Sequence, residues 1–279
     1  MALRGIRRIR AAFVAAVVLA PAVVAVTPAE AATTPAISCT SRDIRLAFRL
    51  LVGIAGALDG RRPAVALHFD DRLRDTSCEV RADRRFDSAS VVKVTVLGAL
   101  LMEAKERGRT LTARESGLAR AMITRSDNAS TDALWQQLGT DRIDEFLNAA
   151  GMKDTDPGRG GHWGLTQITA RDQSRLLRLL TTPNAVLTDA SRAYVLKLMR
   201  EVVPSQRWGT PAGAPATATA QVKNGWLPRA ARGWRVHSVG VFTEAGHDRT
   251  IAVLTEDNAT MASGVDTVEA ISRALHRNL

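Results

Sequence analysis

The sequence predicts a mixed α/β fold of the α+β kind: an antiparallel sheet flanked by N- and C-terminal helices, with an inserted all-helical subdomain. Three observations predict it. Strand-like runs lie towards both ends of the chain, a long helical block separates them, and an apolar helical stripe occurs before the first strands and after the last. A chain of 279 residues, 46% hydrophobic and 24% charged, can bury a core of this kind.

The first 31 residues differ from the rest of the chain. A head of four arginines precedes an apolar run over 11–26, and Ala29–Ala31 has the small-x-small pattern of a cleavage site. We therefore assign residues 1–31 to a secretory signal peptide and expect a secreted, extracytoplasmic protein of the cell envelope. A membrane anchor is the alternative, but Pro21 interrupts a run shorter than the roughly 20 residues of a span. We expect no membrane contact after signal removal, and the export route stays open.

Export changes the interpretation of the two cysteines. Outside a reducing cytoplasm, Cys39 and Cys78 are expected to pair and to join the mature N-terminus to an early strand. A lipid-attachment role for Cys39 is the alternative, although this residue lies well beyond the apolar run. Two cysteines without a CxxC pattern do not indicate structural zinc, and the sequence implies no metal or organic cofactor.

The formal net charge of +10 says little about partners. A basic exported protein is drawn to anionic polymers such as cell-wall material, but the arginines are scattered. With aromatic residues at only 4%, nothing forms a nucleic-acid patch, and we expect no nucleic-acid partner.

The predicted elements follow in order along the chain. Residues 41–59 form one apolar helical stripe that ends at Gly60, and strand-like runs follow at 64–69 and 78–81. Short helical segments are expected at 90–105, 113–124, 131–138, 143–150, 170–180 and 189–202.

The period then changes from helical to two. Residues 217–223 alternate polar and apolar, 236–243 and 250–255 are further strands, and the closing helix carries Val268, Ile271 and Leu275. We assign residues 36–279 to one domain, with an α/β part over 36–83 and 203–279 and a helical part over 84–202.

The motif Ser90-Val91-Val92-Lys93 begins a stretch that is apolar almost throughout as far as Met102. A helix that is apolar all round is normally buried, and Lys93 lies one turn from Ser90 on the same face. Burial lowers the pKa of a lysine, and a neutral amine beside a hydroxyl is a general base beside a nucleophile. For so short a pattern, an N-capping serine followed by a lysine that reaches solvent is the alternative.

Two further motifs accompany it. Ser126-Asp127-Asn128 lies between two helical segments, and Lys223-Asn224-Gly225 ends the alternating strand; S-x-x-K, S-x-N and K-x-G each occur once, in that order. This set resembles S-x-x-K, S-D-N and K-T-G of class A β-lactamases and penicillin-binding proteins. The order helix, strands, helical insert, strands, helix also resembles that family over most of the chain, which implies a β-lactamase-like catalytic domain.

The resemblance implies catalytic roles for four residues. Ser90 would attack a carbonyl, Lys93 would take or relay its proton, and Ser126 would pass a proton to the leaving nitrogen. Lys223 would attract a substrate carboxylate and keep Lys93 deprotonated by repulsion.

It also implies a substrate-binding set, and departures from the family pattern. Asn128 would hold an amide side chain of the substrate, the N–H of Trp226 would join that of Ser90 in an oxyanion hole, and the strand residues Asn224 and Gly225 would line the site. Asn224, however, replaces the threonine of K-T-G. The region corresponding to the family's omega loop, 151–169, is short and has no glutamate, only Asp154 and Asp156. The 90–126 segment is also shorter than in class A enzymes, and the run 158–164 is expected to be a turn.

We therefore expect an exported β-lactamase-related active-site serine hydrolase that forms an acyl-enzyme with β-lactams or D-Ala-D-Ala-like peptides. One alternative is a D,D-carboxypeptidase or transpeptidase-like enzyme. Others are a sensor that binds β-lactams or cell-wall peptides and acylates once or only binds, and a wall-binding module without covalent chemistry. The expected partner is a small-molecule β-lactam or a peptidoglycan peptide, and we expect a monomer. Efficient deacylation is not implied, because the loop glutamate that activates water in class A enzymes has no counterpart.

Overall fold

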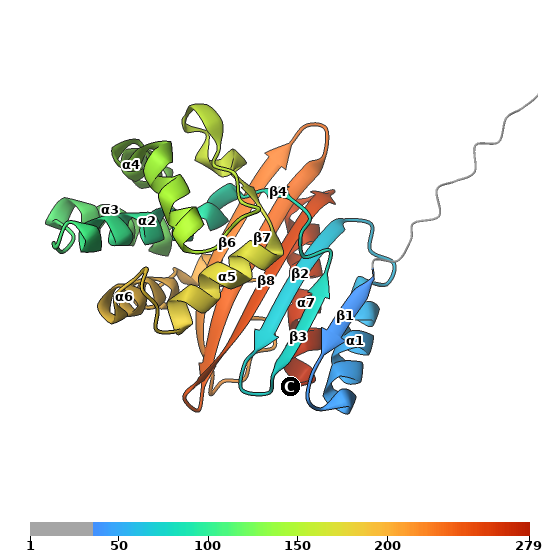
Figure 1. The fold of residues 1–279 in the computed structure, drawn as a ribbon. Coiled ribbons are helices and arrows are strands. Elements are labelled where there is room, and N and C mark those ends of the chain that lie inside the picture. The colour runs from blue at the N-terminus through green and yellow to red at the C-terminus, as the bar shows by residue number, and fades with distance from the viewer. Residues whose placement is uncertain (1–35) are drawn as a thin grey trace, which may run out of the picture. The chain divides into compact units, whose positions relative to one another are not determined.

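The computed structural model describes residues 36–279 (Figure 1). The signal peptide expected at 1–31 lies outside the described residues. Six strands form an antiparallel sheet in the order β1-β3-β2-β8-β7-β6. Their bounds are β1 Ile37–Thr40, β2 Ala64–Asp71, β3 Thr76–Val80, β6 Thr219–Arg229, β7 Gly233–Glu244 and β8 His247–Asn258. The mixed fold with an antiparallel sheet is therefore confirmed.

Two helices cover one face of this sheet. They are α1 Ile44–Leu58 and α7 Met261–Arg277, which come from the two ends of the folded unit (Figure 1). Thr260 and Ser263 cap α7 reciprocally, which satisfies N–H groups that the first helical turn leaves unpaired. Phe69 and Ile251 of the sheet pack with Leu50 of α1 in the core on this side.

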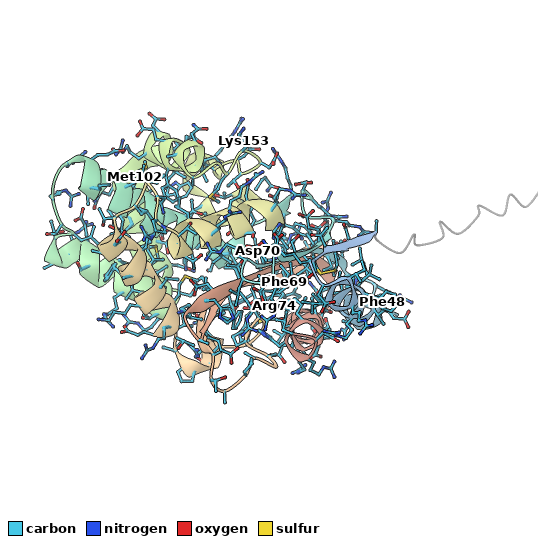
Figure 2. The ribbon with its side chains drawn as sticks, turned by 60° about the horizontal axis from the view of Figure 1, so that its bottom comes forward. Phe48, Phe69, Asp70, Arg74, Met102 and Lys153 are labelled. Atoms are coloured by element: carbon cyan, nitrogen blue, oxygen red, sulfur yellow. A yellow bond between two sulfur atoms is a disulfide. The ribbon has the colours of Figure 1, made fainter. Side chains whose placement is uncertain are left out.

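The helical part lies on the other face. Its helices are α2 Lys93–Glu106, α3 Ala113–Thr124, α4 Asn128–Ala149, α5 Ala170–Thr181 and α6 Asp189–Arg200. Short 3-10 turns are η1 Ala89–Val92, η2 Arg159–Gly161, η3 Trp163–Leu165 and η4 Pro204–Gln206, and β4 Phe86–Asp87 pairs with β5 Gln167–Ile168. Figure 2 shows Met102 among these helices and Phe69 at the sheet.

Helix α2 is the centre of the helical part. Every residue from Lys93 to Ala104 is buried, as the uniformly apolar sequence predicts. Gly98 lets α4 come close, because a Cβ at this position would lie 2.3 Å from the Phe146 ring. This packing fixes the orientation of the helix that carries Lys93.

Three details of the sequence prediction can be compared with the structure. The helices expected at 131–138 and 143–150 belong to one assigned element, α4, in which Gly139 with φ 71° interrupts the helical backbone. The strand expected to end near 223 continues to Arg229. Cys39 and Cys78 form the expected disulfide, between residues paired in register on β1 and β3.

Two negative findings apply to residues 36–279. None of the helices there has the length and hydropathy needed to cross a membrane. No group of three or more His, Cys, Asp or Glu side chains within the same range could hold a metal ion.

Candidate active site

The three sequence motifs meet at the junction of the sheet and the helical part. Lys93, at the start of α2, donates from Nζ to the Ser126 carbonyl at 2.6 Å and to Asn128 Oδ1 at 2.7 Å. The same nitrogen lies 3.2 Å from Ser126 Oγ, and Lys223 Nζ of β6 lies 3.0 Å from that oxygen on its other side. The Ser126 hydroxyl is therefore shared by two lysines from different motifs.

A tight turn between α3 and α4 presents Ser126. Its φ of +57° is in the left-handed region, which costs energy for a residue with a side chain. The next residue, Asp127, accepts a hydrogen bond from Ser130 N at 2.7 Å and so caps α4. The strained turn directs both the carbonyl and the hydroxyl of Ser126 towards Lys93.

Ser90 lies in η1, directly before α2, and is half-buried. The backbone N–H of Lys93 donates to the Ser90 carbonyl, so the two residues are one turn apart as predicted. Gly225 of β6 faces this turn: a Cβ there would lie 2.8 Å from Ser90 N and 2.9 Å from Val91 N. Only glycine allows this close approach of the β6 backbone to the Ser90 amide.

The position of β6 in the sheet explains this approach. It is an edge strand, paired with β7 on one side, so the backbone groups of its outer edge remain available to a ligand. An edge strand beside the N-terminal turn of a serine-bearing helix is a suitable support for an oxyanion.

Both lysines are buried, and burial determines their protonation. Desolvation lowers the pKa of Lys93 from 10.5 to about 8, against the opposing charges of Asp127 and Asp132. Burial also lowers the pKa of Lys223, and the positive charge of Lys93 lowers it further. A measurable fraction of Lys93 is thus neutral near physiological pH, as a general base requires.

Asn224 and Trp226 lie on the opposite face of β6 from Lys223 and Gly225, since side chains alternate along a strand. The Asn224 amide donates to the carbonyls of Gln206 and Trp208, both at 2.9 Å. The Trp226 ring lies 5.9 Å from that of Trp208. Both amide hydrogens of Asn224 are thus used within the protein, and a substrate contact by this side chain stays a prediction.

The loop over 151–169 contributes a residue that the sequence analysis did not select. The Trp163 ring of η3 lies over the Lys93 amine, with its centroid 4.8 Å from Nζ, and its indole N–H donates to Asp132 Oδ1 at 2.7 Å. The two loop carboxylates are engaged by arginines: Asp156 pairs with Arg85, and Asp154 lies 3.9 Å from Arg175. The sequence does show a tryptophan in a glycine-rich turn, which could have marked Trp163 as a candidate. Its contact with Lys93 depends on the path of the loop, which the sequence does not predict.

This fold and the convergence of its motifs place the chain in the β-lactamase-like serine hydrolase superfamily. Residues 102–279 match the Beta-lactamase enzyme family, and the chain belongs to that family. The match begins after Ser90 and Lys93.

Curated relatives match part of the chain. The proteins named "Putative lipoprotein LppW" from Mycobacterium tuberculosis and Mycobacterium bovis are 27% identical over 162 residues, 56% of this chain. The matched region covers 51% of those proteins, so the chain spans about half the length of the curated relatives it matches.

Solved structures match the fold more completely. A class A β-lactamase from Bacteroides cellulosilyticus superposes with a TM-score of 0.72 at 17% identity, over 84% of this chain and 98% of that one. PBP-A gives a TM-score of 0.71 at 20% identity, over 83% and 96%. At these identities the likeness establishes the fold.

Proposed function

We propose that this protein is an exported serine hydrolase that forms an acyl-enzyme on Ser90 with β-lactams or D-Ala-D-Ala-like peptides. The observation that carries the proposal is the Ser126 hydroxyl, 3.2 Å from Lys93 Nζ and 3.0 Å from Lys223 Nζ, beside a turn that bears a serine. In the proposal Ser90 is the nucleophile, Lys93 the base and Ser126 the proton relay, and the contacts between Lys93 and Ser126 support this assignment. A variant of PBP-A, a structural neighbour, is known as an acyl-enzyme complex with penicillin G, which supports this substrate class.

The proposed acylation begins at Ser90. Neutral Lys93 takes the hydroxyl proton as Oγ bonds to the substrate carbonyl carbon. The negative oxygen that develops is stabilised by two backbone N–H groups, that of Ser90 in η1 and that of Trp226 in β6.

Breakdown of the tetrahedral intermediate requires a proton on the leaving nitrogen. Ser126 supplies it as the carbon–nitrogen bond breaks, and Lys93, protonated in the first step, returns a proton to Ser126 across the 3.2 Å contact. Burial and Lys93 lower the pKa of Lys223 in the free protein, and the substrate carboxylate would raise it again and so pair with the charged amine. Asn128 would bind the amide side chain through Nδ2, since its Oδ1 accepts from Lys93.

The second candidate is a protein that acylates without efficient turnover, such as a peptide or β-lactam sensor. Two observations favour it. The loop residue beside Lys93 is Trp163, which has no carboxylate. The two loop carboxylates, Asp154 and Asp156, lie beside arginines, which leaves neither free to act as the base that activates water. A D,D-carboxypeptidase or transpeptidase activity is compatible with the same site if a peptide amine or a slow water accepts the acyl group.

A time course with a chromogenic β-lactam separates these candidates. We expect a burst equal to the enzyme concentration followed by slow turnover, and no burst with Ser90→Ala or Lys93→Ala. A burst with no turnover after it would indicate the second candidate. Lys105→Ala, an exposed lysine at the far end of α2, is the matched control and should retain the burst. Steady turnover without a burst would indicate efficient hydrolysis, release of D-alanine from a pentapeptide would indicate the peptidase, and a burst retained by Ser90→Ala would remove Ser90 from the mechanism.

We propose a location in the cell envelope, as a secreted or anchored protein. The relatives' name supports it, as does the basic and apolar character of residues 1–31. Peptidoglycan peptides would be accessible there, and a monomeric state remains a prediction.

A further inference from the structure

Trp163 has no part in the acylation steps above, yet it contacts the residue on which those steps depend. Its ring centroid lies 4.8 Å from the amine of Lys93. At this distance the ring face attracts a cation and also occupies the space in which water would otherwise solvate the amine.

The ring is held in place from two sides. Its indole N–H donates to Asp132 Oδ1 of α4 at 2.7 Å, and its backbone carbonyl accepts from Ser88 Oγ at 3.2 Å. Ser88 N also donates to the Thr166 carbonyl at 2.8 Å, which ties the end of the same loop to the segment that precedes Ser90. Trp163 is therefore fixed relative to both α4 and the nucleophile turn.

We propose that Trp163, clamped by Asp132, is a positioning residue that covers Lys93, excludes water from its amine and thereby sets the pH range in which Ser90 is acylated. This inference rests on the proposed function, in which Lys93 is the base for Ser90.

The groups that face Lys93 predict opposite changes in its pKa when Trp163 or Asp132 is replaced. Burial lowers the pKa of Lys93 most of all, and the charges of Asp127 and Asp132 raise it. On the β6 side lies Lys223, whose own pKa is lowered by burial and by the positive charge of Lys93.

Removing the ring has two consequences for the pKa of Lys93. Loss of the attraction between ring face and cation would lower it, whereas entry of water weakens the effect of burial and raises it. We expect the second to prevail, because burial is the largest effect on this pKa. Replacing Asp132 by asparagine removes its charge but keeps a hydrogen-bond acceptor for Trp163. Because the charge of Asp132 raises the pKa of Lys93, its removal should lower that pKa.

The experiment measures the pKa of Lys93 directly. The chain has five lysines, so an NMR titration of ¹³C-labelled lysine side chains gives few signals, and Lys93→Arg identifies the one that matters. In Trp163→Ala we expect the pKa of Lys93 to rise from about 8 towards 10.5, and in Trp163→Phe, which keeps a ring, to return towards 8. In Asp132→Asn we expect it to fall. Asp141→Asn removes a charge from the same helix at an exposed site and is the control.

The rate of Ser90 acylation against pH provides the second measurement. Each unit by which the pKa rises reduces the neutral fraction at pH 7 about tenfold, so the profile of Trp163→Ala should move to higher pH and that of Asp132→Asn to lower pH. A loss of stability without a change at Lys93 would lower both rates and leave both profiles in place.

Failure of this inference is distinguishable from failure of the proposed function. If the unsubstituted protein forms no adduct on Ser90, the proposed function fails, and the NMR titration still tests the cover over Lys93. If Trp163→Ala leaves the pKa of Lys93 unchanged, or if it and Asp132→Asn shift that pKa in the same direction, the inference is overturned.

Discussion

At the scale of single residues, the site depends on burying two amines beside one hydroxyl. Lys93 and Lys223 are fully buried, and Ser126 Oγ lies within hydrogen-bonding distance of both. Two ammonium groups this close are unfavourable in a dry site, so the arrangement favours loss of a proton from one of them. Burial of the two amines lowers the stability of the fold, and it also lowers the pKa of Lys93 so that this lysine can act as a base.

This arrangement predicts the pH dependence of acylation. Lys93 acts as a base only when neutral, and its pKa is lowered to about 8. The rate of Ser90 acylation should therefore rise with pH and level off above about 8, as stopped-flow measurements with a reporter β-lactam would show. A rate that falls across this range would mean that the protonated lysine is the active form.

At the scale of elements, the approach of β6 to η1 positions the oxyanion-stabilising groups. We predict that Gly225→Ala displaces the strand edge from the Ser90 amide, since the added Cβ would lie 2.8 Å from that nitrogen. Loss of one oxyanion donor costs about 10²–10³ in rate, and acylation should fall by this order. Gly56→Ala, on α1 where a Cβ meets no atom within 4 Å, is the control. Unchanged acylation in Gly225→Ala would show that β6 does not support the oxyanion.

Much of the site could be predicted at this scale, because each motif identifies a local element. S-x-x-K predicted a serine one turn before a lysine on a buried helix, and the alternating pattern that leads into K-x-G predicted a strand. That residue 225 has to be glycine follows only from the structure. The alternation of β6 also implies that Lys223 and Gly225 share one face, which the sequence analysis did not use when it grouped Asn224 and Trp226 with them. The contact of Trp163 with Lys93 was not predictable, because it depends on the path of an irregular loop.

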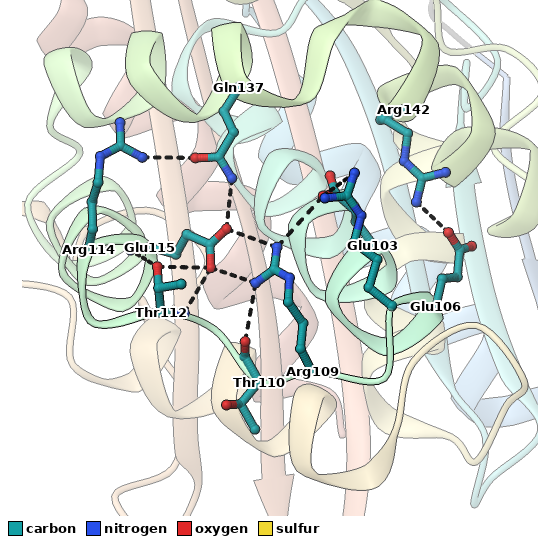
Figure 3. Close-up of polar contacts among 10 residues, drawn as sticks. Glu103, Glu106, Arg109, Thr110, Thr112, Arg114, Glu115, Gln137 and Arg142 are labelled. Carbon is teal, nitrogen blue, oxygen red and sulfur yellow. Dashed lines mark hydrogen bonds and ion pairs between the residues drawn. The ribbon is translucent and has the colours of Figure 1, made fainter.

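At the scale of the whole molecule, a buried polar network supports the helices that hold Ser126. Glu115, in the first turn of α3, accepts from Arg109 at 2.8 and 3.0 Å and from Gln137 of α4 at 2.7 Å, as Figure 3 shows. It also forms a capping box with Thr112. This network joins α3 to α4 on either side of the active-site turn.

We predict that Glu115→Gln lowers the free energy of unfolding by about 1–3 kcal/mol, the usual cost of losing hydrogen bonds to a buried charge. These hydrogen bonds, chiefly that of Arg109, lower the pKa of Glu115 from 4.5 to about 2. Its contribution is thus complete above about 4.5 and is lost as the pH falls towards 2. Urea denaturation at pH 7 and at pH 3 checks this: the difference between the two proteins should shrink at pH 3, and a difference independent of pH would exclude the charge as its source.

The overall architecture could be predicted because hydrophobic period and element order determine which segments can share a core. The order of the strands in the sheet could not be predicted, because β2 pairs with β8, a strand that lies far from it in the sequence. Gly139 lies between the two helical segments expected at 131–138 and 143–150, and its backbone is not helical, although both segments belong to α4. Sequence patterns specify elements, whereas long-range pairing depends on which faces fit together.

The most direct test of the central claim is mass spectrometry of the protein after brief incubation with penicillin G. We predict a covalent adduct of the intact β-lactam mass, mapped by proteolysis to the peptide that contains Ser90 and absent from Ser90→Ala. An adduct on another residue, or none at any pH up to 9, would contradict the assignment of Ser90 and Lys93 as nucleophile and base.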